Sequence, residues 1–142
     1  MMKRYLDSNV FLYPLLYGGD KAKGAIEILR GFLDKEFIAY TSLLTWDEFV
    51  YVLRKEKGKD IAGEESKKFL NLPNLVFLDV KRDILFKAQE LISEHNLRPR
   101  DAIHAASAIL NGINEIISDD EDFDRLKELK RVTLEEYKKE NG

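Results

Sequence analysis

Four places along the 142-residue chain carry carboxylates in settings where they could do chemistry. They are Asp7, Glu48, Asp101 and a run of five acids within residues 119–124. Two carboxylates ~4 Å apart repel by roughly 4 kcal/mol at an effective dielectric near 20, so a cluster of them needs cations. Carboxylate oxygens select hard ions, and Mg²⁺ or Mn²⁺ held in this way supports hydrolysis of phosphodiester bonds.

Two of these places each follow directly after an expected strand. Residues 3–6 are typical of a short strand that ends at Asp7, with Ser8 and Asn9 opening a helix, and residues 115–118 are an apolar strand before the acidic run. Because ligands of open parallel sheets bind at the carboxyl ends of the strands, we expect both acidic places at one edge. The alternative for Asp7 is a plain helix cap.

Glu48 lies on an expected helix with apolar neighbours on its own face. Leu44, Tyr51 and Val52 stand four residues before, three after and four after it. A solvated glutamate rarely has such neighbours, which favours a functional carboxylate over the adjacent Asp47. The alternative is a side chain that reaches solvent or pairs with a nearby lysine.

Asp101 falls in the first turn of an expected helix, two residues after Pro99. A carboxylate is favoured there by the helix dipole alone, so a capping role is its alternative. His104 could ligate a metal or carry a proton, but we expect a partly exposed helix histidine. His95, near a helix end, is expected to complement the dipole.

The acidic run holds more like charge than one turn needs. Asp120 is the favoured functional residue and Asp122 a further one, whereas Asp119 and Asp124 are also explained by an Asp-rich turn with one helix cap. The choice among Asp119, Asp120 and Asp122 stays open at this level.

Hydrophobic periodicity predicts strands that alternate with helices. Strands are expected at residues 3–6, 37–41, 74–80, 115–118 and 131–133. Helices are expected at residues 9–16, 20–34, 42 or 45 to 57, 59–71, 82–95, 100–110 and, as a short one, 123–129. This alternation implies crossover connections, hence an α/β fold whose mostly parallel sheet of four to five strands carries helices on both faces.

Composition places the chain among ordinary folded domains. It is 44% hydrophobic and 35% charged, with a net charge of −3, so it is not a non-specific cationic binder of nucleic acid. The absence of cysteine excludes disulfides and thiolate zinc sites and fits a cytoplasmic protein. We see no signal peptide or membrane anchor, and we expect one domain over residues 1–142, with residues 134–142 as a frayed, charged tail.

Four segments resemble, in order and spacing, the acidic motifs of PIN domains, most closely those of VapC-type toxins. The segments are residues 7–9, 45–49, 100–106 and 118–123. The resemblance implies an α/β/α sandwich and a Mg²⁺- or Mn²⁺-dependent ribonuclease. By position it implies a catalytic and metal-binding set of Asp7, Glu48, Asp101 and Asp120, with Asp122 as a further ligand and with Ser8, Asn9 and Ser118 as orienting residues.

The resemblance also implies partners, namely an RNA substrate, a second copy of the chain and a small antitoxin that covers the active-site groove. For RNA binding we favour Arg98 and Arg100, which flank the Asp101 motif, over a second basic cluster around Arg54 and Lys55. Solvated surface charge is the alternative for both. The family also contains RNA-processing nucleases without an antitoxin and catalytically weak binding modules, so these remain alternative functions.

Overall fold

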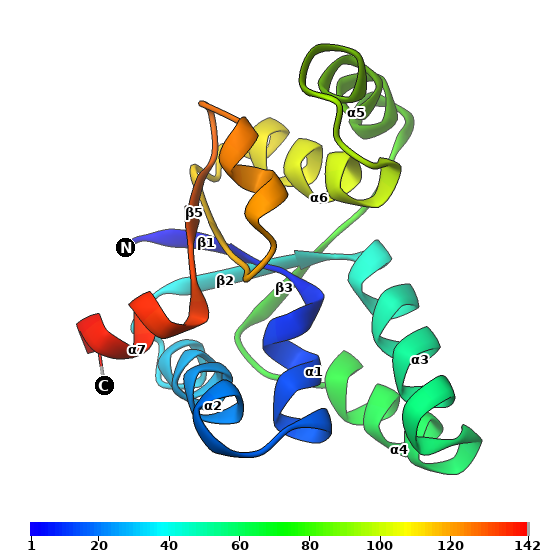
Figure 1. Ribbon diagram of the computed structural model, residues 1–142, viewed down its shortest axis with the longest axis vertical. Helices are drawn as coiled ribbons and strands as arrows, with labels where there is room; N and C mark the ends of the chain where they lie inside the picture. Colours follow the sequence, from blue (N-terminus) through cyan, green and yellow to red (C-terminus); the bar gives the residue numbers. More distant parts are fainter. Residues whose placement is uncertain (142) are drawn as a thin grey trace.

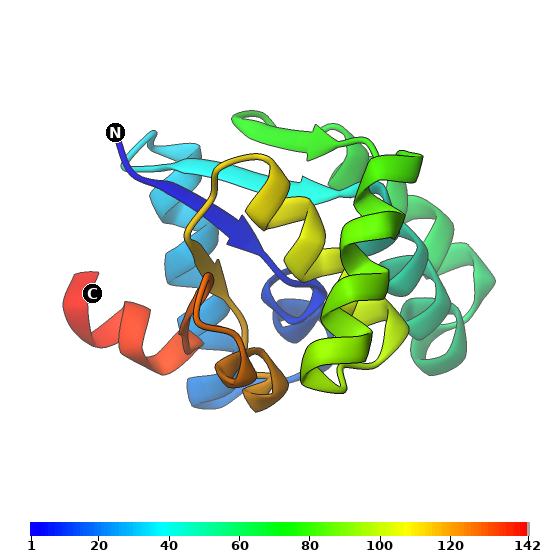
Figure 2. The same cartoon turned by 90° about the horizontal axis from the view of Figure 1, so that it is seen from above.

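Strand β1 (Lys3–Leu6) lies in the middle of a five-stranded sheet in the computed structural model, which describes residues 1–141. The other strands are β2 (Ile38–Ser42), β3 (Leu75–Leu78), β4 (Glu115–Ile117) and β5 (Lys130–Val132). Every pairing is parallel, and the spatial order is β3-β2-β1-β4-β5. Figure 1 labels four of these strands, and Figure 2 shows β3, β2 and β1 side by side. The predicted parallel sheet is therefore confirmed.

Helices cover both faces of this sheet. They are α1 (Ser8–Leu16), α2 (Gly19–Leu33), α3 (Leu43–Lys57), α4 (Lys59–Leu70), α5 (Arg82–His95), α6 (Pro99–Leu110) and α7 (Leu134–Asn141). In Figure 1, α5 and α6 lie on one side of the strands and the other five helices on the opposite side. The predicted α/β/α layering is confirmed.

Two apolar cores join these layers to the sheet. Successive side chains of a strand point to opposite faces, so Leu6 packs with α1 and α2 in one core, whereas Tyr5 packs with α6 in the other. Both side chains are fully buried. Strand β1 is thus held from both sides, which fixes the position of the residue that follows it.

The strand order creates a switch point between β1 and β4. The chain runs from β1 outward to β2 and β3, and then crosses back to place β4 and β5 on the other side of β1. At such a point neighbouring crossovers diverge and leave a crevice at the carboxyl ends of the strands. Asp7 and Ser118 follow β1 and β4 directly, and the N–H of Asp7 donates to the carbonyl of Ile117 at 3.1 Å.

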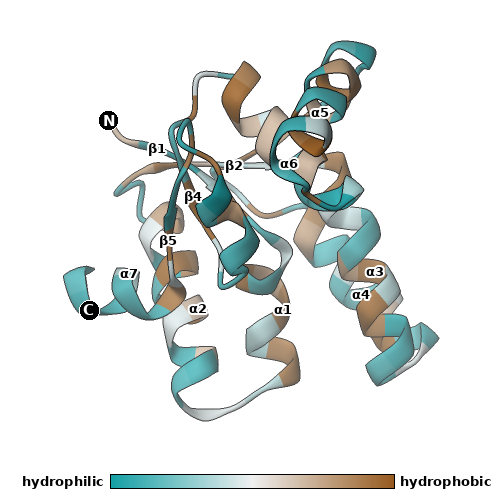
Figure 3. Ribbon diagram, turned by 45° about the horizontal axis from the view of Figure 1, so that its top comes forward, coloured by the Kyte–Doolittle hydropathy of each residue, from teal (hydrophilic) through white to brown (hydrophobic). Residues whose placement is uncertain are grey.

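Two predictions for the C-terminal part of the chain were wrong. The short helix expected at residues 123–129 is a 3₁₀ helix over Glu121–Arg125, because Asp120 caps it through a hydrogen bond from the N–H of Asp122. The tail expected to fray forms α7 up to Asn141, because buried Leu134 and Tyr137 anchor it; Gly142 lies outside the described residues. The composition of residues 134–141 suggested a solvated tail because most of these residues are hydrophilic, as the colour of α7 in Figure 3 shows.

None of the helices within residues 1–141 is long and apolar enough to cross a membrane.

His95 lies in the last turn of α5, as predicted.

Candidate active site

Asp7 is the N-cap of α1 and the first residue after β1. Its Oδ1 accepts the backbone N–H of Ser8 at 2.7 Å, and its Oδ2 accepts the hydroxyl of Ser118 at 2.6 Å. Burial raises the pKa of Asp7, while His104 and the Ser118 hydrogen bond act to lower it. Protein donors on both oxygens hold this carboxylate in one orientation at the switch point.

Ser118 is fully buried and joins three segments. Besides donating to Asp7, its Oγ accepts the backbone N–H of Asp120 at 3.0 Å and the side-chain amide of Asn9 at 3.4 Å. The Oδ1 atom of Asn9 is a buried acceptor without a partner within residues 1–141. Such an orphan is costly in a folded protein, and a bound cation or its water would satisfy it.

Asp101, Asp120 and Asp122 form a compact acidic cluster. Each places a carboxylate oxygen within 4.8 Å of the oxygens from the other two. Burial, together with the negative charges of Asp120 and Asp7, raises the pKa of Asp101 to about 6. The cluster is therefore under electrostatic strain that a divalent cation would relieve.

The other acids of the run have separate roles. Asp119 caps α7, because its Oδ1 accepts the N–H of Leu134 at 3.1 Å. Both carboxylate oxygens of Asp124 accept from the Arg131 guanidinium at 2.9 Å, which lowers the pKa of Asp124. Of the three acids that the sequence left open, the structure therefore places Asp120 and Asp122 in the acidic cluster and Asp119 outside it.

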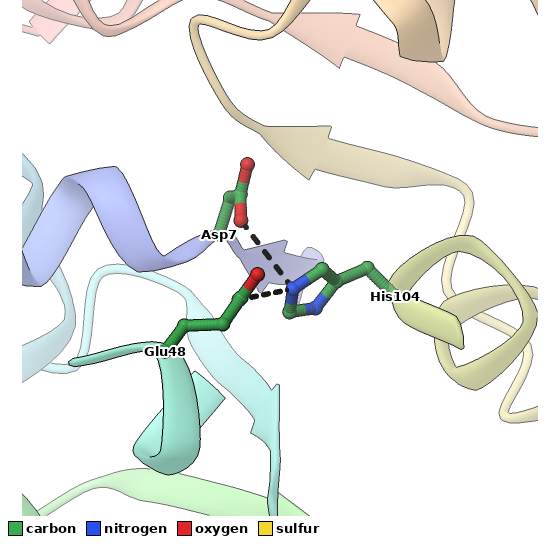
Figure 4. A group of neighbouring side chains, drawn as sticks. All are labelled: Asp7, Glu48 and His104. Atoms are coloured by element: carbon green, nitrogen blue, oxygen red, sulfur yellow. Dashed lines mark hydrogen bonds and ion pairs between the residues drawn. The ribbon is translucent and has the colours of Figure 1, made fainter. Parts of the chain in front are cut away.

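Glu48 meets a partner that sequence analysis did not assign to it. Its Oε1 lies 2.6 Å from Nε2 of His104, and the same nitrogen lies 3.6 Å from Oδ1 of Asp7 (Figure 4). The other ring nitrogen, Nδ1, lies 2.6 Å from the hydroxyl of Tyr5. Glu48 therefore pairs with a histidine rather than with a lysine or with solvent.

The expectation of a partly exposed His104 was wrong, since the side chain is only 1% exposed. Burial acts to lower its pKa, but Tyr5, Glu48 and Asp7 together raise the pKa of His104 well above its ordinary value. A positive imidazole between two carboxylates compensates their repulsion. One signal was present in the sequence. His104 stands one turn after Asp101 among alanines, and small apolar residues of this kind are typical of a helix face that packs closely against its neighbours.

A cavity of about 460 Å³ opens beside these groups. Its lining includes Glu48, Asp101 and Asp120 together with Arg98 and Arg100. Arg98 also reaches Asp122, at 3.6 Å. The second basic cluster does not line this cavity, because Arg54 and Lys55 lie in the last turn of α3, away from the acids.

The donor set fits a hard divalent cation. The acidic cluster and the group formed by Asp7, Glu48 and His104 supply carboxylate oxygens at one sheet edge, and the chain contains no cysteine. Together the two groups contain five carboxylates. Such all-oxygen sites suit Mg²⁺ and Mn²⁺.

Several solved structures share this fold. VapBC2 from Rickettsia felis, bound to a DNA fragment from its promoter, has a TM-score of 0.73 at 19% identity, covering 93% of this chain and 98% of that one. A toxin-antitoxin complex from Klebsiella pneumoniae has a TM-score of 0.67 at 23% identity, covering 92% and 97%. VapC20 of Mycobacterium tuberculosis, a sarcin-ricin loop cleaving toxin, has a TM-score of 0.70 at 20% identity, covering 85% and 92%.

A search of curated protein sequences gave no match. The model of the protein family described as "PIN domain" matches residues 4–129, which include every acid of the site. With the fold, the switch-point acids and this match in agreement, the chain belongs to the PIN domain family.

Proposed function

We propose that this protein is a cytoplasmic, single-domain endoribonuclease that depends on Mg²⁺ or Mn²⁺ and acts as the toxin of a VapBC-type pair. One observation carries the proposal: carboxylates from α3, α6 and the turn after β4 line one cavity at the switch point, and Asp7, directly after β1, lies in one group with Glu48 of that cavity. PIN domains are generally nucleases, and the structural neighbours include VapBC complexes.

Asp101, Asp120 and Asp122, with Asp7 and Glu48, are the residues that would hold the metal. When bound, such an ion polarises a phosphodiester and lowers the pKa of a coordinated water. Asp7 is held by Ser8 and Ser118, and Asn9 offers its unpartnered oxygen beside them. Arg98 and Arg100 at the mouth of the cavity would bind RNA phosphates, with Arg54 and Lys55 as more distant contacts.

Cleavage of labelled single-stranded RNA tests the activity. We expect cutting with Mg²⁺ or Mn²⁺, no cutting in chelator, and products with a 5′-phosphate as the family resemblance implies. Asp120→Asn should abolish cleavage. Asp47→Asn, an exposed acid beside Glu48, is the matched control and should cut like the parent. Equal cleavage in chelator would refute the metal-dependent mechanism.

Exposed apolar side chains on α3 support a homodimer. Leu43, Trp46 and Tyr51 are 48%, 40% and 61% exposed on one helix, which is typical of an interface. Light scattering at micromolar concentration should give twice the chain mass of 16.5 kDa. A monomer mass would contradict the dimer.

A small antitoxin is the other proposed partner. An apolar cavity of about 140 Å³ between α1, α3 and α4, lined by Phe11, Phe49 and Phe69 among others, is available to an apolar segment of it. We expect the product of a short neighbouring reading frame to form a stable complex with this chain and to block cleavage. If no such frame exists, an RNA-processing nuclease without antitoxin becomes the better assignment.

A further inference from the structure

We infer that His104 is a positioning residue: supported from behind by Tyr5 and Ser42, it holds Oε1 of Glu48 and so aims Oε2 at the acidic cluster. This inference rests on the proposed metal site and gives His104 a role that the resemblance does not imply. Figure 4 shows one ring nitrogen of His104 facing both Glu48 and Asp7.

Three short hydrogen bonds in series make up the support. The Tyr5 hydroxyl lies 2.8 Å from Oγ of Ser42 and 2.6 Å from Nδ1 of His104, and Nε2 lies 2.6 Å from Glu48. Tyr5, Ser42 and His104 are each at most 1% exposed. Buried, fully partnered groups lose little freedom when a ligand arrives, so the series is pre-organised.

The series joins four elements, of which α3 and α6 otherwise meet little. Tyr5 lies on the central strand, Ser42 ends β2, His104 comes from α6 and Glu48 from α3. Helix α3 packs mainly against α4 and α1, and its contact with α6 is small. The Glu48–His104 hydrogen bond is therefore the main direct connection between Glu48 and the helix that carries Asp101.

The two oxygens of Glu48 are not equivalent in this arrangement. Oε1 is occupied by His104, whereas no protein donor reaches Oε2 within residues 1–141. Glu48 also lines the cavity that holds Asp101 and Asp120. A hydrogen bond that fixes one oxygen of a carboxylate also fixes the direction of the other oxygen, which is then free to bind a metal. This is the usual effect of a hydrogen-bond partner behind a metal-binding residue.

His104 is not expected to bind the metal itself. Both ring nitrogens already face protein partners at 2.6 Å, and ligation through Nε2 would require breaking the hydrogen bond to Glu48. Tyr5→Phe leaves the imidazole in place and removes only its support.

The test measures Mn²⁺ binding by calorimetry and by thermal melts, with RNA cleavage as a second readout. His104→Asn removes the donor to Glu48, and we expect it to raise the Mn²⁺ half-saturation concentration by roughly 10-fold, the lower end of the usual loss at such positions. His104→Gln places an amide near the position of Nε2 and should restore part of this loss. Tyr5→Phe, which keeps the buried ring, should weaken Mn²⁺ binding by a smaller factor.

Ser107→Ala is the matched control. Ser107 is buried on α6, one turn after His104, and its hydroxyl bonds only to the carbonyl of Ile103 in its own helix. We expect its Mn²⁺ midpoint and cleavage rate to equal those of the parent. For the positioning variants, kcat should fall while KM for RNA is unchanged, because the proposed RNA contacts lie elsewhere.

Parent-like Mn²⁺ midpoints in both Tyr5→Phe and His104→Asn, with only their melting temperatures lowered, would overturn the inference and leave a structural role. Equal losses in the Asn and Gln variants would also overturn it, because an amide near the position of Nε2 would then restore nothing. Tyr5→Phe keeps the test usable if a His104 variant does not fold. If the parent binds Mn²⁺ but cuts no RNA, the proposed function fails, while the binding midpoints still decide this inference.

Discussion

The hydroxyl of Ser118 donates to Oδ2 of Asp7 at 2.6 Å, across 111 positions of sequence. The two residues follow the adjacent parallel strands β1 and β4. Their hydrogen bond joins the ends of these strands at the switch point, beside the other acids. Ser118 also accepts the N–H of Asp120, so one small side chain orients acids on both sides of the crevice.

Replacing Ser118 with Ala should therefore lower both stability and activity. The change leaves Oδ2 of Asp7 without its donor and the N–H of Asp120 without its acceptor, and one unpaired buried group costs about 1–3 kcal/mol. Chemical denaturation of the metal-free protein measures this loss. Ser66→Ala removes a buried hydroxyl that bonds only within α4, so it should leave Mn²⁺ binding and cleavage unchanged.

Asp101→Asn should melt at a higher temperature than the parent in chelator, because it removes one charge from a cluster of like charges. It should also lose most of the stabilisation by Mn²⁺, which for a ligand at a hundred times its dissociation constant is about 2.7 kcal/mol. If Asp101 only caps α6, the variant should instead melt lower and keep the parent's Mn²⁺ response.

Asp7→Asn provides a contrast to Asp101→Asn. Both oxygens of Asp7 accept protein hydrogen bonds, so an amide nitrogen in either position meets a donor. We expect this variant to melt below the parent in chelator and to cut no RNA. A gain in melting temperature would show that repulsion outweighs these hydrogen bonds at Asp7.

The raised pKa of Asp101, about 6, predicts opposite pH dependences for stability and metal binding. Between about pH 4 and 6 the folded protein binds a proton that the unfolded chain does not, so this contribution to stability is present at low pH and is lost as pH rises through 6. The difference in melting temperature between Asp101→Asn and the parent in chelator should thus be small at pH 4.5 and grow to a plateau above pH 7.

Metal binding should show the reverse trend, because the proton competes with the cation. Mn²⁺ affinity of the parent should fall by about tenfold per unit below pH 6 if one proton is displaced. Calorimetric titrations at pH 5, 6, 7 and 8 measure this slope. An affinity independent of pH across this range would exclude Asp101 as a ligand with the raised pKa.

Arg100→Gln should raise KM for RNA and leave kcat unchanged, because Arg100 lines the cavity mouth without contacting the acids. Loss of one phosphate contact should reduce the salt dependence of RNA affinity by about 0.7 in slope. Arg54→Gln, in the last turn of α3, should raise KM for RNA by a smaller factor than Arg100→Gln. Equal effects of the two variants would place RNA across α3 rather than over the cavity.

Local sequence was enough to predict the strands, the helices up to residue 110 and the acids that follow two of the strands. Alternation of apolar periods predicted the parallel sheet, and a strand followed at once by an acid predicted which edge carries Asp7 and Asp120. Local pattern failed at α7, because two buried side chains anchor that helix although its composition is that of a solvated tail. A period of hydrophobicity reports which face of an element is buried, but not what it is buried against.

Only the tertiary structure decided which partner each polar side chain has. It divided residues 119–124 between a helix cap, an arginine pair and an acidic cluster, and it turned a predicted surface histidine into the buried neighbour of Glu48. These partners lie on other elements, at sequence separations such as the 56 positions between Glu48 and His104. Hydrogen bonding and charge compensation act through space over a few ångströms, so the packing of α3 and α6 around β1 had to be known before either could be assigned.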